Sequence, residues 1–222
     1  MKRTEPTEML LCNSQDFAKR IAFHEAGHAA GIHLYNRQQS LPSVFFQIRI
    51  EPHSALATDA WLRDRFLAGV ENGYLIDNLP VTLIESASYF TADGLDAYQA
   101  AFEADMTNLL VGALAEAKYV AMSHGKLFDP VEVNIETLLA HGGSSDLSKV
   151  YNYLERFIAS KNERDKKIEH LLGKALAFID HHQNWQAIER LANFLLTCHQ
   201  DTISCEDAIS VLDSNAVCKS VQ

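Results

Sequence analysis

The longest stretch of helical periodicity in the chain is LDAYQAAFEADMTNLLVGALAEAKYVAMSHG, residues 95–125, and it sets the strongest constraint on the fold. Its apolar residues recur every three or four positions, which places them on one face of a helix, and Gly125 is a typical stop. The length of this helix predicts a central position in the core. Because 222 residues with 47% hydrophobic content suit one well-filled core, we expect a single domain over residues 1–222.

Shorter patterns complete a mainly α fold with a small β element. β-branched and aromatic residues in 43–52 and 74–86 predict two strands, although Pro80 weakens the second. The expected helices run from a cap at Asn13 or Ser14 to about Tyr35, over 57–70 and 133–140, from a cap at Ser144 or Ser145, over 166–198 with a break near 182–184, and over 205–213. A loop is expected around 91–94, and we expect both ends, residues 1–13 and 214–222, to be flexible.

The segment FHEAGHAAG, residues 23–31, lies inside the first expected helix. Positions i and i+4 share a helix face, so His24 and His28 can aim ring nitrogens at one ion about 2 Å away. Glu25, rotated off that face, is placed to accept a proton from a water on the metal, which is the chemistry of HExxH sites. The motif has only three fixed positions, so an ordinary polar helix face is the alternative. Gly27 indicates a close approach to the backbone, either by a ligand or by another helix.

A third metal ligand decides the type of site. The metzincin pattern HExxHxxGxxH has Gly31 in place but needs a histidine where the chain has Leu34, and His33 lies on a different helix face. The remaining carboxylates in suggestive settings are Glu116, on the long helix, and Asp146, just after HGGSS.

Charge and hydropathy exclude other functional classes. A formal net charge of -10 argues against a surface built to bind nucleic acid, which needs clustered lysine and arginine. The chain contains no apolar run of about 18 residues and no apolar signal-peptide core near its start. We therefore expect a soluble, cytoplasmic protein without membrane insertion.

Two further features bear on a substrate. The expected strand at 44–50 has an edge that an extended peptide can join, and an ordinary structural strand is the alternative. His124 and His141 flank the segment that leads to Asp146, and His53 follows the first strand, so each is a candidate for contacts around the site, with a solvated loop histidine as the alternative.

Three separated segments resemble the peptidase domain of FtsH-type AAA+ membrane proteases. IAFHEAGHAA (21–30) is similar to the zinc helix of that family, VGALAEA (111–117) to its GGRAAEE-like helix, and GGSSDL (142–147) to the GASNDL-like segment that supplies an aspartate ligand. The C-terminal part, from about 175 to 212, is similar to the family's closing helices. The segments occur in the family's order and cover most of the chain, from residue 17 to about 213.

The resemblance implies an FtsH peptidase-domain-like helical bundle with HExxH on a core helix. It implies His24, His28 and Asp146 as zinc ligands and Glu25 as the catalytic base. The function implied is that of a zinc-dependent metalloendopeptidase, which hydrolyses peptide bonds of unfolded or accessible polypeptides through a zinc-bound water activated by Glu25.

The chain also departs from the family. It has neither a GxxxxGK[ST] phosphate loop nor a membrane anchor, so we expect it to act without its own ATPase. Ala113 and Ala117 replace an arginine and an acid of the GGRAAEE-like segment, and residues 41–98 match only loosely, so substrate choice is the least transferable property. A homo-oligomer and a separately encoded ATPase or adaptor are compatible with the resemblance. The alternative function is a non-catalytic domain of this type that serves as a regulatory or protein-interaction module.

Overall fold

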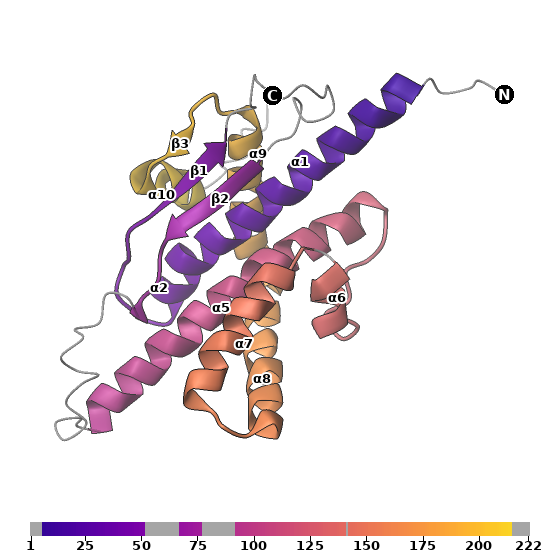
Figure 1. The fold of residues 1–222 in the computed structure, drawn as a ribbon. Helices are drawn as coiled ribbons and strands as arrows, with labels where there is room; N and C mark the ends of the chain where they lie inside the picture. Colours follow the sequence, from indigo (N-terminus) through magenta and orange to yellow (C-terminus); the bar gives the residue numbers. More distant parts are fainter. Residues whose placement is uncertain (1–5, 52–66, 77–91, 141, 215–222) are drawn as a thin grey trace.

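The computed structural model describes residues 6–51, 67–76, 92–140 and 142–214 of the chain. These residues form a mainly helical fold with a three-stranded antiparallel sheet, which confirms the expected mainly α class with a small β element. Figure 1 shows the long helix α1 (Pro6–Ala30) between the sheet and a second long helix, α5 (Ala92–Ser123). Helices α7 (Ser144–Phe157) and α8 (Lys161–Asp180) pack against α5 on its other side. None of the described helices is long and apolar enough to cross a membrane.

Helix α1 carries the HEAGH segment near its C-terminal end. The helix begins at Pro6 rather than at a cap on Asn13 or Ser14, because a proline needs no N–H partner in a first turn. It continues without a break into the π-helix η1 (Gly31–Tyr35) and the short helix α2 (Asn36–Gln38). The histidines of HEAGH therefore lie within continuous helical backbone, which fixes their spacing.

Helix α5 holds the central position that its length predicts, since it contacts α1, α7 and α8. It starts at Ala92, so Asp93 and Gly94 are helical rather than part of the expected loop, and Thr91 lies outside the described residues. Small residues bring α5 close to α1. A Cβ placed on Gly27 would lie 2.7 Å from the Ala115 Cβ and 2.9 Å from the Gly112 Cα. Close helix packing therefore accounts for Gly27.

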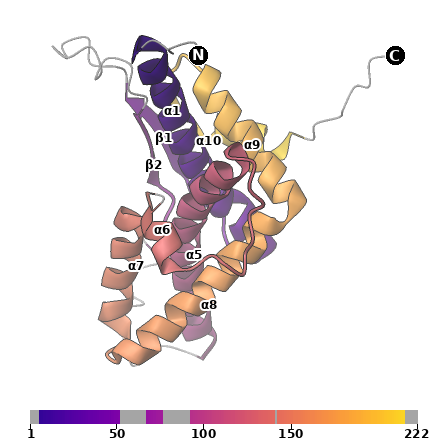
Figure 2. The same ribbon diagram turned by 90° about the vertical axis from the view of Figure 1, so that its right-hand side faces the viewer.

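The remaining helices follow the expected order with small shifts in their ends. They are α6 (Ile135–Ala140), α7, α8, α9 (His182–Thr197) and α10 (Cys205–Asp213). The α8–α9 corner, visible in Figure 2, is made by extended backbone at His181, one residue before the expected break. Helix α7 is preceded by Gly143 in the cap position without a side-chain cap bond, whereas Ser204 caps α10 by accepting the Asp207 N–H at 3.1 Å.

The sheet has the strand order β2-β1-β3 and is antiparallel throughout. Its strands are β1 (Phe46–Glu51), β2 (Leu67–Asn72) and β3 (Thr202–Ile203). β1 agrees with the expected first strand, but residues 67–70 are part of β2 and not of the expected helix over 57–70, of which 57–66 lie outside the described residues. Residues 74–76 of the expected second strand are not a strand, and 77–86 lie outside the described residues. Among the described strands β1 is central, so the edge beside α1 belongs to β2 rather than to residues 44–50.

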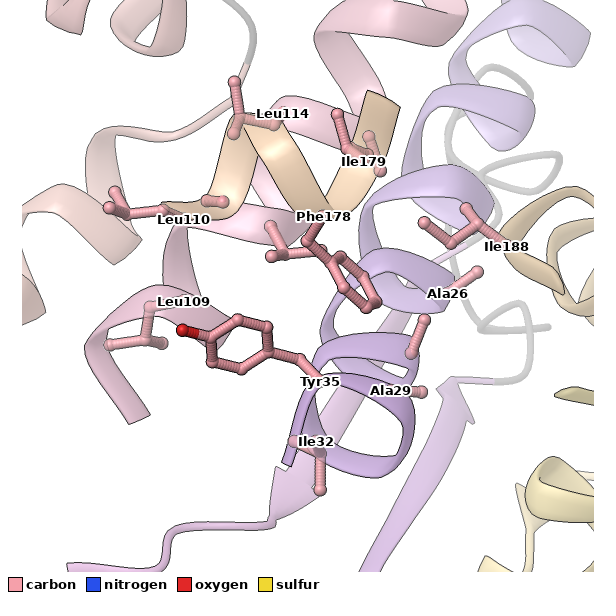
Figure 3. Packing of buried hydrophobic residues seen from close by; sticks show 14 of the residues in the cluster. Ala26, Ala29, Ile32, Tyr35, Leu109, Leu110, Leu114, Phe178, Ile179 and Ile188 are labelled. Atoms are coloured by element: carbon pink, nitrogen blue, oxygen red, sulfur yellow. The ribbon is translucent and has the colours of Figure 1, made fainter. Parts of the chain in front are cut away.

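One continuous apolar core joins α1, α5, α8 and α9. Figure 3 shows Phe178 of α8 and Ile188 of α9 near Ala26 of α1, and the same core contains Ala29, Leu110, Leu114 and Ile179. Phe23, next to the first histidine, stacks on Tyr119 with ring centroids 4.5 Å apart. The helix that carries the HEAGH segment is thus held by core packing immediately beside and between its histidines, which makes it a rigid support. Of the expected flexible tail 214–222, only Ser214 lies within the described residues.

Candidate metal centre

Three potential metal-binding side chains converge where α1, α5 and α7 meet. His24 and His28 come from successive turns of α1, and Asp146 comes from the first turn of α7. The Asp146 Oδ2 lies 3.0 Å from the His24 Nε2 and 3.4 Å from the His28 Nε2. Among the described residues, His24, His28 and Asp146 form a group whose donor atoms can share one metal ion. These atoms all lie within 4.8 Å of one another.

The spacing and surroundings of these donor atoms fit a metal ion. Ligands about 2 Å from a tetrahedral ion lie roughly 3.3 Å from one another, close to the two distances observed. The absence of a side chain at Gly112 of α5 makes room for the ring of His28, because a Cβ at this position would overlap that ring. Two imidazoles and one carboxylate form the donor set of a three-ligand site that keeps a fourth position open.

Both histidines are oriented through their other ring nitrogen. The Nδ1 of His28 lies 3.0 Å from the backbone carbonyl oxygen of Asn108, which can only accept, so Nδ1 carries the proton and Nε2 remains free as a ligand. The Nδ1 of His24 lies 3.1 Å from Glu116 Oε2 and is oriented in the same way. Glu116, the other candidate for a third ligand, therefore contacts His24 on the side opposite to Asp146 and lies outside the three-donor cluster.

Arg20 holds Glu116 in place. Its Nε and Nη2 donate to Glu116 Oε1 at 2.9 and 2.7 Å, while the other carboxylate oxygen, Oε2, faces His24. Arg20 lies one helical turn before His24, so two residues on one face of α1 share a buried carboxylate of α5. A chain of contacts thus runs from the surface arginine to the ring of the candidate ligand.

The electrostatics of the cluster favour an added positive charge. Burial disfavours a charged His24, but its bonds to Asp146 and Glu116 outweigh that effect and raise the pKa of His24 to about 10. Burial also opposes ionisation of Asp146, yet the bonds from His24 and His28 hold the pKa of Asp146 well below its ordinary value. The pKa of Glu116 is likewise lowered, against the effect of burial, by His24 and Arg20. A proton on His24 therefore neutralises the carboxylates when no metal ion does.

Glu25 lies beside the cluster and contacts the sheet. Its Oε2 accepts the backbone N–H of Val70 at 2.8 Å, and the side chain is half-buried. Because the N–H of Val70 points to Glu25 and not to β1, the backbone N–H and carbonyl of Val70 face the side of β2 away from β1. The edge of the sheet and the candidate base are therefore next to each other.

A small pocket of about 50 Å³ opens beside His28. Its walls include Ile32 of η1, Val70 and Asn72 of β2, Asn108 and Leu109 of α5, and Lys149 of α7. Lys149 also donates to the second oxygen of Asp146, with Nζ 3.3 Å from Oδ1. The pocket thus lies between the sheet edge and the helix that supplies the carboxylate ligand.

The other residues considered from the sequence are not in this cluster. His33 faces α10, where its Nε2 lies 3.0 Å from Asp213 Oδ2. His124 is exposed just after α5, and His53 and His141 lie outside the described residues. Sequence patterns gave no signal for Arg20, Val70 or Lys149, because each reaches the site through a contact between distant segments.

No family model, no curated protein and no solved structure matches this chain. The assignment of the site therefore rests on its geometry and on the sequence segments that the geometry brings together.

Proposed function

We propose that this protein is a zinc metallopeptidase. The observation that carries the proposal is the convergence of His24, His28 and Asp146, with both Nε2 atoms directed at the Asp146 carboxylate, beside the carboxylate of Glu25. Two nitrogen donors, one oxygen donor and an open fourth position are the arrangement of catalytic zinc sites. When bound, zinc acidifies a water molecule and polarises the carbonyl of a substrate.

The residues of the chain supply the remaining steps. Glu25 lies beside the first ligand and accepts the proton of the attacking water, then delivers it to the amine that leaves when the peptide bond breaks. The N–H of Val70 fixes the carboxylate through Oε2, and the other oxygen, Oε1, is the proposed acceptor of this proton. Glu116 and the Asn108 carbonyl hold the two imidazoles in the tautomer that presents Nε2.

A polypeptide is the substrate that the surroundings of the site favour. The carbonyl of Val70 faces the same side of β2 as its N–H, away from β1, and an extended peptide can pair with such an edge. The three segments that resemble FtsH-type peptidase domains meet around the cluster, which supports membership of that group as part of the proposal. We expect cleavage of unfolded or accessible chains without ATP.

The test is hydrolysis by a matched pair of variants. Glu25→Gln keeps an oxygen that can accept the Val70 N–H, so we expect full zinc content and loss of cleavage of an unfolded casein substrate by at least about 100-fold. Glu132→Gln changes an exposed acid in the α5–α6 loop and serves as the control with unchanged activity. Zinc binding without Glu25-dependent cleavage would overturn the peptidase and favour the non-catalytic interaction module.

A further inference from the structure

The pocket beside His28 lies where a substrate strand would place a side chain. Its walls come from β2 on one side and from Lys149 of α7 on the other, with α5 and η1 beneath. A peptide paired with the edge of β2 that faces away from β1 would pass between these walls. Because alternate side chains of a strand point to opposite faces, a residue next to the scissile bond can enter the pocket.

Among the described residues, two charged side chains other than the metal ligands line this pocket, Asp105 and Lys149, and they differ in what they offer a ligand. Asp105 is buried, and its two carboxylate oxygens accept the backbone N–H groups of Leu75 and Ile76 at 2.9 and 3.0 Å. These two N–H groups already stabilise the negative charge of Asp105. The side chain of Lys149 is 48% exposed and can turn toward an incoming group.

Asp146 neutralises the charge of Lys149 less strongly once a metal ion is bound to Asp146. Its ammonium lies 3.3 Å from Asp146 Oδ1, and Asp146 is also the carboxylate that faces the two histidines. A cation held by Asp146 draws on the same negative charge, which leaves Lys149 less neutralised. The ammonium group of Lys149 can then form an ion pair with an anionic group in the pocket.

We propose that this pocket receives an acidic side chain of the polypeptide substrate and that Lys149 selects it. The inference rests on the proposed peptidase function, and it names a substrate preference of the same site. Val70, Ile32 and Leu109 contact the stem of the side chain, while the ammonium of Lys149 meets its carboxylate. Glutamate has the length and charge that this arrangement favours.

The cleavage experiment uses internally quenched peptides that differ at one position beside the scissile bond, with Glu, Gln or Lys there. For the wild-type protein we expect kcat/KM to be roughly five- to tenfold higher for Glu than for Gln, the size of a partly screened ion pair. Lys149→Gln should remove the preference, and Lys149→Glu should invert it in favour of Lys. Lys126→Glu alters the net charge equally at an exposed position after α5 and should leave the preference intact.

A binding experiment separates this inference from the peptidase function. Zinc-loaded Glu25→Gln protein is titrated with the same peptides, labelled for fluorescence anisotropy, with and without the Lys149→Gln change. Tighter binding of the Glu peptide by roughly five- to tenfold, lost in Lys149→Gln, is the expected result. Cleavage without any Lys149-dependent preference would overturn the pocket assignment alone. Lys149-dependent binding without wild-type cleavage would overturn the peptidase and leave the acidic-peptide pocket standing.

Discussion

Helix α5 carries two acidic clusters that are built differently. At Glu103, the carboxylate accepts from the ammonium groups of Lys167 and Lys174 of α8, at 2.5 and 2.6 Å. At Glu116, the partners are Arg20 and His24 of α1, at 2.7 and 3.1 Å. Both carboxylates are largely buried, and both link α5 to a neighbouring helix.

The difference lies in how the charges balance. Two lysines pair with the single carboxylate of Glu103, so its negative charge is neutralised without a metal ion or an added proton. Around the candidate metal centre, within the part of the chain that the structure describes, the carboxylates of Glu25, Glu116 and Asp146 outnumber the lysine and arginine side chains paired with them, which are Arg20 and Lys149. The first cluster joins helices, whereas the second retains a place for one more positive charge, either a proton on His24 or a metal ion.

Among residues that are not metal ligands, the carboxylate that orients His24 should have the largest effect on zinc binding when it is removed. We expect Glu116→Gln to weaken zinc binding by about 10- to 100-fold and Arg20→Ala by about tenfold, because contacts beyond the ligands orient them. Competition with a chromogenic zinc chelator measures the affinity. Lys19→Ala, an exposed neighbour on α1, is the control, and equal affinities in all variants would contradict the orienting role.

Zinc binding should release a proton. Because the pKa of His24 is raised to about 10 without a metal, the residue is protonated near neutral pH, and a ligand nitrogen must lose that proton. The apparent affinity should therefore fall about tenfold for each pH unit below 10 from this group alone. Calorimetry in buffers of different ionisation enthalpy should show about one proton released from His24 at pH 8. No buffer dependence would mean that His24 is neutral before zinc arrives.

A methyl group at Gly112 should damage the centre through packing alone. The added Cβ of Gly112→Ala would occupy the space of the His28 ring, so we expect a loss of about 1–3 kcal/mol in the free energy of unfolding and weaker zinc binding. Gly173→Ala on α8 is the matched change, since nothing lies within 4 Å of its added Cβ. That variant should be about 0.5–1 kcal/mol more stable. Denaturant unfolding compares the two, and equal stabilities would contradict the tight packing at Gly112.

Changing Glu103 should alter the stability of the fold without altering the affinity for zinc. Lys167 and Lys174 lower the pKa of Glu103 to about 2 against the effect of burial, so its contribution is fully present above the unfolded value of 4.5. This contribution is lost as the pH falls from 4.5 toward 2. Glu103→Gln should therefore cost about 1 kcal/mol at neutral pH, since water screens the part-exposed lysines, and progressively less in acid. A change in zinc affinity in this variant would contradict the separation of the two clusters.

Local patterns predicted the helices and the candidate ligands better than they predicted the surroundings of the site. The spacing of His24 and His28 is a property of one helix, and the periodicity of apolar residues is enough to predict α5. β2 was expected as the end of a helix because LAGVEN has little strand character of its own, and its pairing with β1 determines the structure. Glu116 was visible as a candidate, but its contact with the far side of His24 depends on how α1 and α5 cross. Arg20 and Lys149 became visible only through such crossings.

The most direct test of this account is the zinc content of the purified protein by elemental analysis. Wild-type protein and Glu25→Gln should each hold one zinc ion per chain, because Glu25 is not among the three converging donors. Asp146→Asn should hold much less after the same dialysis, since an amide oxygen is a far weaker zinc ligand than a carboxylate. A wild-type protein without stoichiometric zinc, or an Asp146→Asn protein that retains all of it, would contradict the proposed metal centre.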